Sequence, residues 1–260
     1  WALILAALPG FVLAAAMMIV CRDPRPGKSP STQIDAAIPQ RGALADLLEQ
    51  PGYRYLCVAA TLSSMGGYMV LAFLPAYAIR TFDLSTGIVG SALALLLGVG
   101  GGLGTYLGGV LGDRTTQRGA ASPLLISMAA CVISGPMFLL AFYISNLPLL
   151  AFMLVVPCVT MTAWMGPNWA TVQSLSAIKH RAFASAFILL LINLIGLGAG
   201  PTLVGLLSDV FTGLGNANGL RAALSVSMSV FPLAGLFFWL AHRSCARKSA
   251  SDAAFAVSTE

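Results

Sequence analysis

The sequence predicts an all-α polytopic membrane protein with seven transmembrane helices, and three observations support this. Hydrophobic residues make up 58% of the 260 residues and charged residues only 9%, against about 25% charged residues in an ordinary soluble domain. The apolar residues gather into seven long runs, and the basic residues gather in every second connection between them. A chain this apolar has too little polar surface to face water, which excludes a soluble globular class.

A membrane-spanning helix needs about 20 mostly apolar residues, and seven stretches of the chain meet that length. They are residues 1–21, 54–79, 86–112, 121–144, 147–172, 182–208 and 220–241. Six of the seven contain proline. Membrane helices tolerate proline because neighbouring helices and local adjustments satisfy the freed backbone groups, so we expect each run to form one helix.

The basic residues predict how these helices are oriented. Of the 14 lysines and arginines, 2 lie on one side of the membrane, Arg80 and Arg221. The other 12 lie on the opposite side: Arg22, Arg25, Lys28, Arg41, Arg54, Arg114, Arg118, Lys179, Arg181, Arg243, Arg247 and Lys248. The positive-inside rule assigns the richer side to the cytoplasm. We therefore expect an integral protein of a bacterial inner membrane, with its C-terminus in the cytoplasm.

The long connection 22–53 reads as a cytoplasmic loop of two parts. Its first part, RDPRPGKSPSTQ, is rich in proline and polar residues and is expected to be disordered. Its second part places three leucines on one helical face and predicts a short amphipathic helix at the interface: Leu44, Leu47 and Leu48. Residues 242–260 are expected to form a cytoplasmic tail that is disordered from 249 onward.

Small residues recur at helical spacing in two of the runs. The third run carries one glycine every fourth residue, at Gly100, Gly104, Gly108 and Gly112. Such spacing lets two membrane helices approach closely, either as static packing or as a contact that slides during a conformational change. The sixth run carries a GxxxGP pattern, which we also assign to helix packing: Gly196, Gly200 and Pro201.

Polar and aromatic side chains on otherwise apolar helices predict a cavity wall. The candidates are Tyr68 in the second run, Thr160, Trp164 and Asn168 at helical spacing in the fifth, and Asn193 in the sixth. Alternatively, Asn193 bonds a neighbouring helix backbone, Trp164 is ordinary packing and Trp169 is an interfacial belt residue. No ionisable side chain lies near the middle of any run, so this chain offers no buried carboxylate for proton coupling.

The segment GGVLGDRTTQR resembles a loop signature of the major facilitator superfamily, G-x-L-[AG]-D-R-x-G-[RK]-[RK]. The matching positions are Gly109, Leu111, Asp113, Arg114 and Arg118, whereas Thr116 stands where the signature has glycine. In the family this loop joins the second and third helices of each six-helix half. The resemblance implies that 54–241 form a C-terminal six-helix half and that 1–21 are the last helix of a missing N-terminal half. The start at Trp1, without an initiator methionine, fits a fragment.

Three further stretches resemble the spinster-like branch of that superfamily. They are CRDPRPG at 21–27, GYMVLAFLPAYAIR at 67–80 and LLINLIGLGAGPTLVGLLSD at 190–209. The resemblance implies secondary transport by alternating access, with a lipid-like or amphipathic small molecule or another organic solute as substrate. It also implies that Asp113 acts as a gating latch against a helix N-terminus of the other half, with Arg114 and Arg118 holding the loop at the cytoplasmic face. Alternatively, these charges only stop the helix.

Other function classes need residues that the runs lack. The alternative within the same superfamily is an organic-anion, sugar-acid or drug carrier. A sugar-acid or organic-anion carrier would need a buried arginine or lysine, and none is visible in the runs. A membrane-embedded enzyme would need a clustered set such as DxxxD or HxxxH. We therefore expect no catalytic residue, cofactor, metal or nucleic acid, and three partners: the lipid bilayer, a small-molecule substrate and the N-terminal half.

Overall fold

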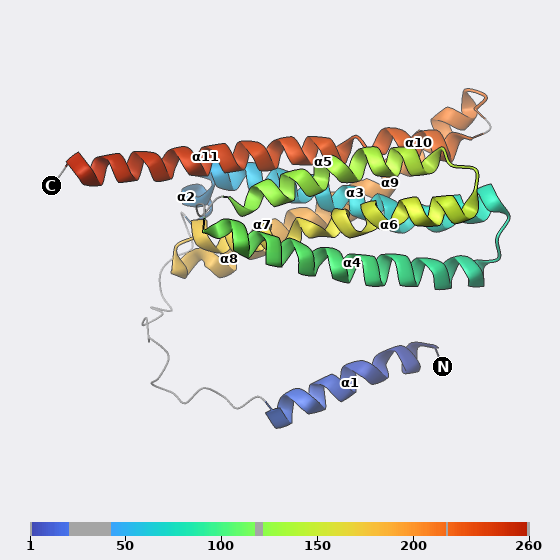
Figure 1. Ribbon diagram of the computed structural model, residues 1–260, viewed down its shortest axis with the longest axis horizontal. Helices are drawn as coiled ribbons and strands as arrows, with labels where there is room; N and C mark the ends of the chain where they lie inside the picture. The colour runs from blue at the N-terminus through green and yellow to red at the C-terminus, as the bar shows by residue number, and fades with distance from the viewer. Residues whose placement is uncertain (1, 21–42, 118–121, 217, 259–260) are drawn as a thin grey trace. The chain divides into compact units, whose positions relative to one another are not determined.

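The computed structural model describes residues 2–20, 43–117, 122–216 and 218–258, and every regular element within these ranges is a helix (Figure 1). The chain divides into two units, residues 1–39 and 40–260. The proline-rich part of the predicted loop 22–53 lies outside the described residues, as does Arg118.

The first unit contributes one apolar helix, α1 (Ala2–Val20). Its large side chains are exposed, for example Phe11 at 73% and Met18 at 86%. Its stretch Gly10–Val20 is apolar but shorter than the six candidate membrane spans of the second unit. The helix corresponds to the first predicted run.

The second unit holds six spans that are long and apolar enough to cross a membrane. They are α3 (Pro51–Phe82), α4 (Thr86–Thr116), α5 (Pro123–Phe142), α6 (Leu147–Ala163) with α7 (Met165–Leu175), α8 (Arg181–Leu191) with the π-helical turn η2 (Ile192–Leu197) and α9 (Gly198–Gly213), and α10 (Gly219–Ser227) with α11 (Val230–Ser258). A short 3-10 turn, η1 (Ile178–His180), precedes α8. Together with α1, these spans confirm the predicted six-helix half plus one helix.

Three of the spans are interrupted where the sequence predicted continuous helices. The fifth run breaks at Trp164, the sixth contains η2, and the seventh breaks between α10 and α11. A proline follows each interruption, at Pro167, Pro201 and Pro232. Proline has no N–H and its ring crowds the preceding turn, so the backbone rearranges one turn before it.

The prediction that α4 ends before Asp113 is wrong. The helix continues to Thr116, so Asp113 and Arg114 lie on its last turn. The threonine that replaces the glycine of the loop signature helps to continue the helix. The hydroxyls of Thr115 and Thr116 donate to the carbonyl of Gly112 at 2.8 and 3.1 Å, and no glycine ends the helix there.

The predicted disorder of the C-terminal tail is also wrong for residues 249–258. Helix α11 runs without interruption from Val230 to Ser258. The segment SASDAAFAVS is rich in alanine, the strongest helix former, and contains neither glycine nor proline.

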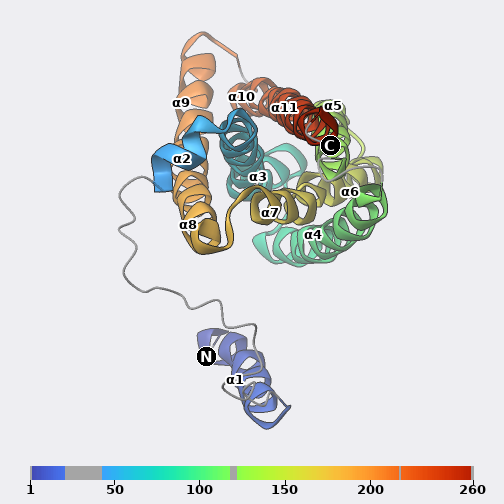
Figure 2. The same cartoon turned by 90° about the vertical axis from the view of Figure 1, so that its left-hand side faces the viewer.

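The spans of the second unit pack around α3. Viewed end-on, α3 lies among the other spans (Figure 2), and 56% of its most apolar stretch is buried. Two tyrosines tie it to its neighbours: the Tyr77 hydroxyl donates to the Phe142 carbonyl at 2.7 Å, and the Tyr53 hydroxyl donates to the Ala184 carbonyl at 2.9 Å. These bonds fix α3 against α5 and α8.

The predicted amphipathic helix is present as α2 (Ala43–Glu49). Its Leu47 is buried in the same apolar cluster as Tyr53, and Leu48 packs against that cluster. The leucine face of α2 therefore packs on the helix bundle itself.

Candidate functional site

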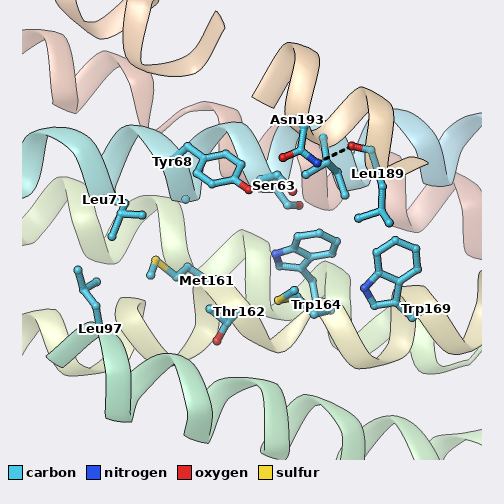
Figure 3. Close-up of a pocket in the computed structure, with 14 residues that line it drawn as sticks. Ser63, Tyr68, Leu71, Leu97, Met161, Thr162, Trp164, Trp169, Leu189 and Asn193 are labelled. Carbon is cyan, nitrogen blue, oxygen red and sulfur yellow. Dashed lines mark hydrogen bonds between the residues drawn. The ribbon is translucent and has the colours of Figure 1, made fainter. Parts of the chain in front are cut away.

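The second unit contains a cavity of about 330 Å³ between α3, the α6–α7 break and the α8–η2 segment (Figure 3). We call it the central pocket and define it by its 14 lining residues. They are Ser63, Ser64, Gly67, Tyr68, Leu71, Leu97, Met161, Thr162, Trp164, Met165, Trp169, Leu189, Ile192 and Asn193.

Three of the five predicted cavity residues meet in the central pocket: Tyr68, Trp164 and Asn193. Thr160 does not line it, because its hydroxyl bonds the Ser134 hydroxyl at 2.7 Å and so faces α5. Asn168 is fully buried in the bundle and does not line it either. The spacing of these residues predicted one shared face for an unbroken helix, and the break at Trp164 divides that face.

Sequence reasoning missed several pocket residues. Ser63 and Ser64 lie in the segment SSMGG, whose small polar residues could have signalled a cavity wall. Trp169 lines the pocket, whereas the sequence offered it as an interfacial belt residue. Met161 and Thr162 carried no signal, since single residues of these types are common on membrane helices.

The central pocket is lined mainly by apolar and aromatic side chains and contains no acidic or basic residue. Three of its polar groups already bond the protein. Ser63 shares a hydrogen bond with the Cys131 sulfur at 3.3 Å, Thr162 donates to the Gly101 carbonyl at 2.9 Å, and the Asn193 amide donates to the Leu189 carbonyl at 2.8 Å. Asn193 thus bonds the preceding turn of its own span, in α8.

Two interrupted spans meet at the pocket. The break at Trp164 supplies Trp164 and Met165, and η2 supplies Ile192 and Asn193. A π-turn inside a membrane helix costs regular hydrogen bonds and is frequent at functional sites. Discontinuous helices are also a common source of substrate sites near the bilayer midplane. The least regular backbone of these two spans therefore lies at the pocket.

The glycines of α4 form a packing face against α6 and α7. All four are buried, and a Cβ at Gly104 or Gly108 would overlap the carbonyl oxygens of Val159 or Ala163. At Gly100 and Gly112 a Cβ would lie 3.3 Å from Cys158 and 3.1 Å from Pro167. Close helix approach therefore requires glycine at the two central positions.

The glycines of the GxxxGP pattern face α3. A Cβ at Gly196 would lie 3.3 Å from the Met65 nitrogen, and one at Gly200 would lie 3.1 Å from the Met65 carbonyl oxygen. Pro201 follows directly and is half-buried. The pattern therefore lies where η2 and α9 pack on α3, one of the helices that line the central pocket.

The charged end of α4 stands apart from the pocket. Asp113 and Arg114 are exposed on its last turn. Among residues 43–117, 122–216 and 218–258, no side chain forms a hydrogen bond or ion pair with the Asp113 carboxylate. Gly109 lies one turn earlier, and its Cα is 3.0 Å from a Cβ built at Gly166.

Comparison with known proteins agrees with this fold. The family model of the Major Facilitator Superfamily matches residues 1–201. An MFS-type efflux pump of Mycolicibacterium smegmatis (strain ATCC 700084 / mc(2)155) is 31% identical over 201 residues, which cover 77% of this chain and 47% of the relative. The chain thus spans about half the length of the curated relative.

Two solved structures share the fold. Both are crystal structures of a bacterial homolog to the human lysosomal transporter Spinster in an inward-facing conformation. The unoccupied one has a TM-score of 0.74 at 22% identity and covers 92% of this chain and 58% of that chain. The occupied one has a TM-score of 0.67 at 21% identity, covering 91% and 56%.

The family match extends over more than three quarters of the chain, and the helices, the loop signature on α4 and the related structures agree with it. The chain belongs to the Major Facilitator Superfamily, whose members are membrane transporters and not enzymes.

Proposed function

We propose that this chain carries one half of a secondary transporter that moves an amphipathic or lipid-like organic solute by alternating access. The observation that carries the proposal is the central pocket at the two interrupted spans. Such transporters bind substrate between two halves that rock about a site near the midplane. The efflux activity in the name of the mycobacterial relative supports export as the direction.

The lining of the pocket supports an amphipathic substrate. Leu71, Leu97 and Ile192 offer apolar contact, and Tyr68 and Ser64 offer polar atoms. The 14 described lining residues offer a buried ion no countercharge, which is costly in a low-dielectric site. A charged headgroup would therefore have to be neutralised by the other half.

The exposed faces of two spans support a second half. Only 17% of the most apolar stretch of α4 and 22% of that of α8–η2–α9 are buried, against 44% for α5 and for α10–α11. We propose that these open faces contact an N-terminal six-helix half, with 1–21 as its last helix, 22–53 as a cytoplasmic connection, 54–241 as the C-terminal half and 242–260 as a cytoplasmic tail of a bacterial inner-membrane protein.

Asp113 fits a latch between the halves. Its carboxylate is exposed at the end of α4 and has no partner among the described residues, so a partner in the other half is free to bind it. A helix N-terminus there would contribute about 0.3–1 kcal/mol when exposed and up to about 2 kcal/mol when partly buried. Arg114 would hold the end of α4 at anionic headgroups.

A blocking substitution tests the proposed site. Gly67 lines the pocket, and a Cβ there meets nothing within 4 Å. A side chain can therefore leave the backbone at this position, and the indole of Gly67→Trp should fill the cavity. Cells that make the full-length protein and lack other pumps are loaded with Nile red or an NBD-labelled lysophosphatidylcholine, and export is followed by fluorescence. Export should fall to background at normal surface expression.

Gly87→Trp is the matched control. Gly87 begins α4 away from the pocket, and a Cβ there also meets nothing within 4 Å. Export by this variant should equal that of the wild type. Unchanged export by Gly67→Trp would contradict the assignment of the pocket as the substrate site.

A further inference from the structure

The central pocket contains hydrogen-bond donors that the protein leaves unused. Ser63, Thr162 and the Asn193 amide bond the protein. By contrast, the Tyr68 hydroxyl and the indole nitrogens of Trp164 and Trp169 have no acceptor anywhere in the described ranges. All three residues line the cavity.

Trp164 is held rigidly, so its donor direction is set by the fold. Only 4% of the residue is exposed. Its ring lies 6.1 Å from the ring of Phe238, and its carbonyl accepts the Ser127 hydroxyl at 3.2 Å. Within the described residues, the fully enclosed polar atoms without a partner are those of the Asn168 amide. The Trp164 nitrogen is therefore not sealed in the core and opens onto the pocket.

The two best-placed donors face the same space. In Figure 3 the hydroxyl end of Tyr68 and the nitrogen edge of Trp164 both point into the opening between α3 and the α6–α7 break. An indole N–H can donate but never accept. Buried tryptophan and tyrosine normally find a partner, and an unpaired donor in a site that excludes water is costly. This arrangement is complementary to an acceptor.

We propose that the central pocket recognises its substrate through an acceptor oxygen, such as that of a carbonyl or an N-oxide, seated between the Trp164 N–H and the Tyr68 hydroxyl. The inference rests on the proposed function, because it takes this pocket as the substrate site. The donors are neutral, so the oxygen needs no formal negative charge. The competing arrangement is an aromatic cage, in which the ring faces bind an organic cation.

An isosteric pair of probes separates the two arrangements. N,N-dimethyldecylamine N-oxide and decyltrimethylammonium share their tail. The N-oxide has an oxygen in place of one methyl group and is neutral overall, whereas the ammonium carries a positive charge. Binding to the full-length protein in lipid nanodiscs is measured by equilibrium dialysis at neutral pH, with empty nanodiscs subtracted. The N-oxide should bind about tenfold more tightly. Because its neutrality also favours an uncharged pocket, the two variants below measure the share that comes from hydrogen bonds.

Two conservative variants identify the donors. Trp164→Phe and Tyr68→Phe keep an aromatic ring and remove the N–H or the hydroxyl. Each should weaken N-oxide binding by about three- to tenfold and leave ammonium binding unchanged. Trp239→Phe is the control, because Trp239 lies on α11 against Arg243 and does not line the pocket.

The remaining outcomes are distinct. Equal or tighter binding of the ammonium probe, equal loss of both probes in the Phe variants, or binding of neither probe would overturn the acceptor inference. Gly67→Trp then reports on the site itself. If it abolishes export while the probes show no preference for the N-oxide, only the inference fails. If it changes neither export nor probe binding, the proposed function fails as well.

Discussion

At the scale of single residues, the close approach of α4 to α6 depends on Gly104. A Cβ at this position would overlap the carbonyl oxygen of Val159 and the hydroxyl of Thr162. We predict that Gly104→Ala lowers the stability of the full-length protein by about 1–3 kcal/mol, the usual cost of overpacking. Thermal unfolding in nanodiscs, followed by intrinsic fluorescence, measures the loss.

Gly102 provides the control for Gly104. It lies on the same helix, and a Cβ there meets nothing within 4 Å. Gly102→Ala should be neutral or slightly stabilising, because alanine favours the helix by about 1 kcal/mol. Equal melting temperatures for the two alanine variants would show that the glycine face does not limit the helix approach.

The surroundings of Asn168 lead to a second prediction, about the stability of the protein. Both polar atoms of its amide are buried and have no partner among the described residues, and such groups cost about 1–3 kcal/mol. Asn168→Leu keeps a similar volume and removes the unpaired amide, so it should stabilise the protein by about 1 kcal/mol. A lower melting temperature would contradict this and show that the amide has a partner in the full-length protein.

The residue scale also shows the limits of the sequence pattern. Polar side chains on apolar helices predicted Tyr68, Trp164 and Asn193 together, and they share one pocket. Thr160 and Asn168 were grouped with them by spacing alone. Thr160 and Asn168 lie away from the pocket because the helix is interrupted at Trp164 between them. A regular helical repeat does not predict how the chain continues after such an interruption.

At the scale of elements, length and hydropathy predicted the spans well and their interruptions poorly. Each proline was visible in the sequence, yet α3 and α5 run straight through Pro75 and Pro136. Pro167 and Pro201, by contrast, lie just beyond an interruption. Whether a helix breaks at a proline depends on which neighbouring groups satisfy the freed carbonyl, and those neighbours come from distant parts of the chain.

The π-turn is expected to depend on Pro201. This proline cannot donate to the Leu197 carbonyl, and the Gly198 N–H bonds the Asn193 carbonyl in the π pattern. Pro201→Ala restores the missing donor and should favour a regular α-helix, which moves Asn193 away from the pocket. Export should fall at least severalfold while the melting temperature stays the same or rises.

Pro136→Ala is the comparison for this variant, since α5 is already continuous there. It should leave export unchanged. Wild-type export by Pro201→Ala would show that the π-turn does not position Asn193 for transport.

At the scale of the whole molecule, the proposed transport requires two halves whose contacts with each other form and break during the cycle. Asp113 is exposed and has no partner among the described residues, so its effect should appear in transport and not in folding. Asp113→Asn removes the charge at constant size and should reduce export by about two- to fivefold, as expected for the loss of a helix-dipole contact. Surface expression should stay normal.

Asp113→Glu tests the geometry of the same contact. The charge is kept but moves outward by one methylene, so a latch should be partly impaired. Wild-type export by both the Asn and the Glu variants would leave only a topological role, in which these charges keep the end of α4 on the cytoplasmic side.

The central claim is that the central pocket opens to each side of the membrane in turn, and side-specific thiol labelling tests it most directly. Ser64→Cys places a thiol on the pocket wall of a cysteine-free full-length protein. Thr116→Cys and Asn216→Cys mark the predicted cytoplasmic and external sides. The account predicts that a membrane-impermeant reagent labels Ser64→Cys from either side, and that dimethyldecylamine N-oxide slows both reactions. Labelling from one side only would contradict it, whereas equal rates with and without the N-oxide would contradict the acceptor inference alone.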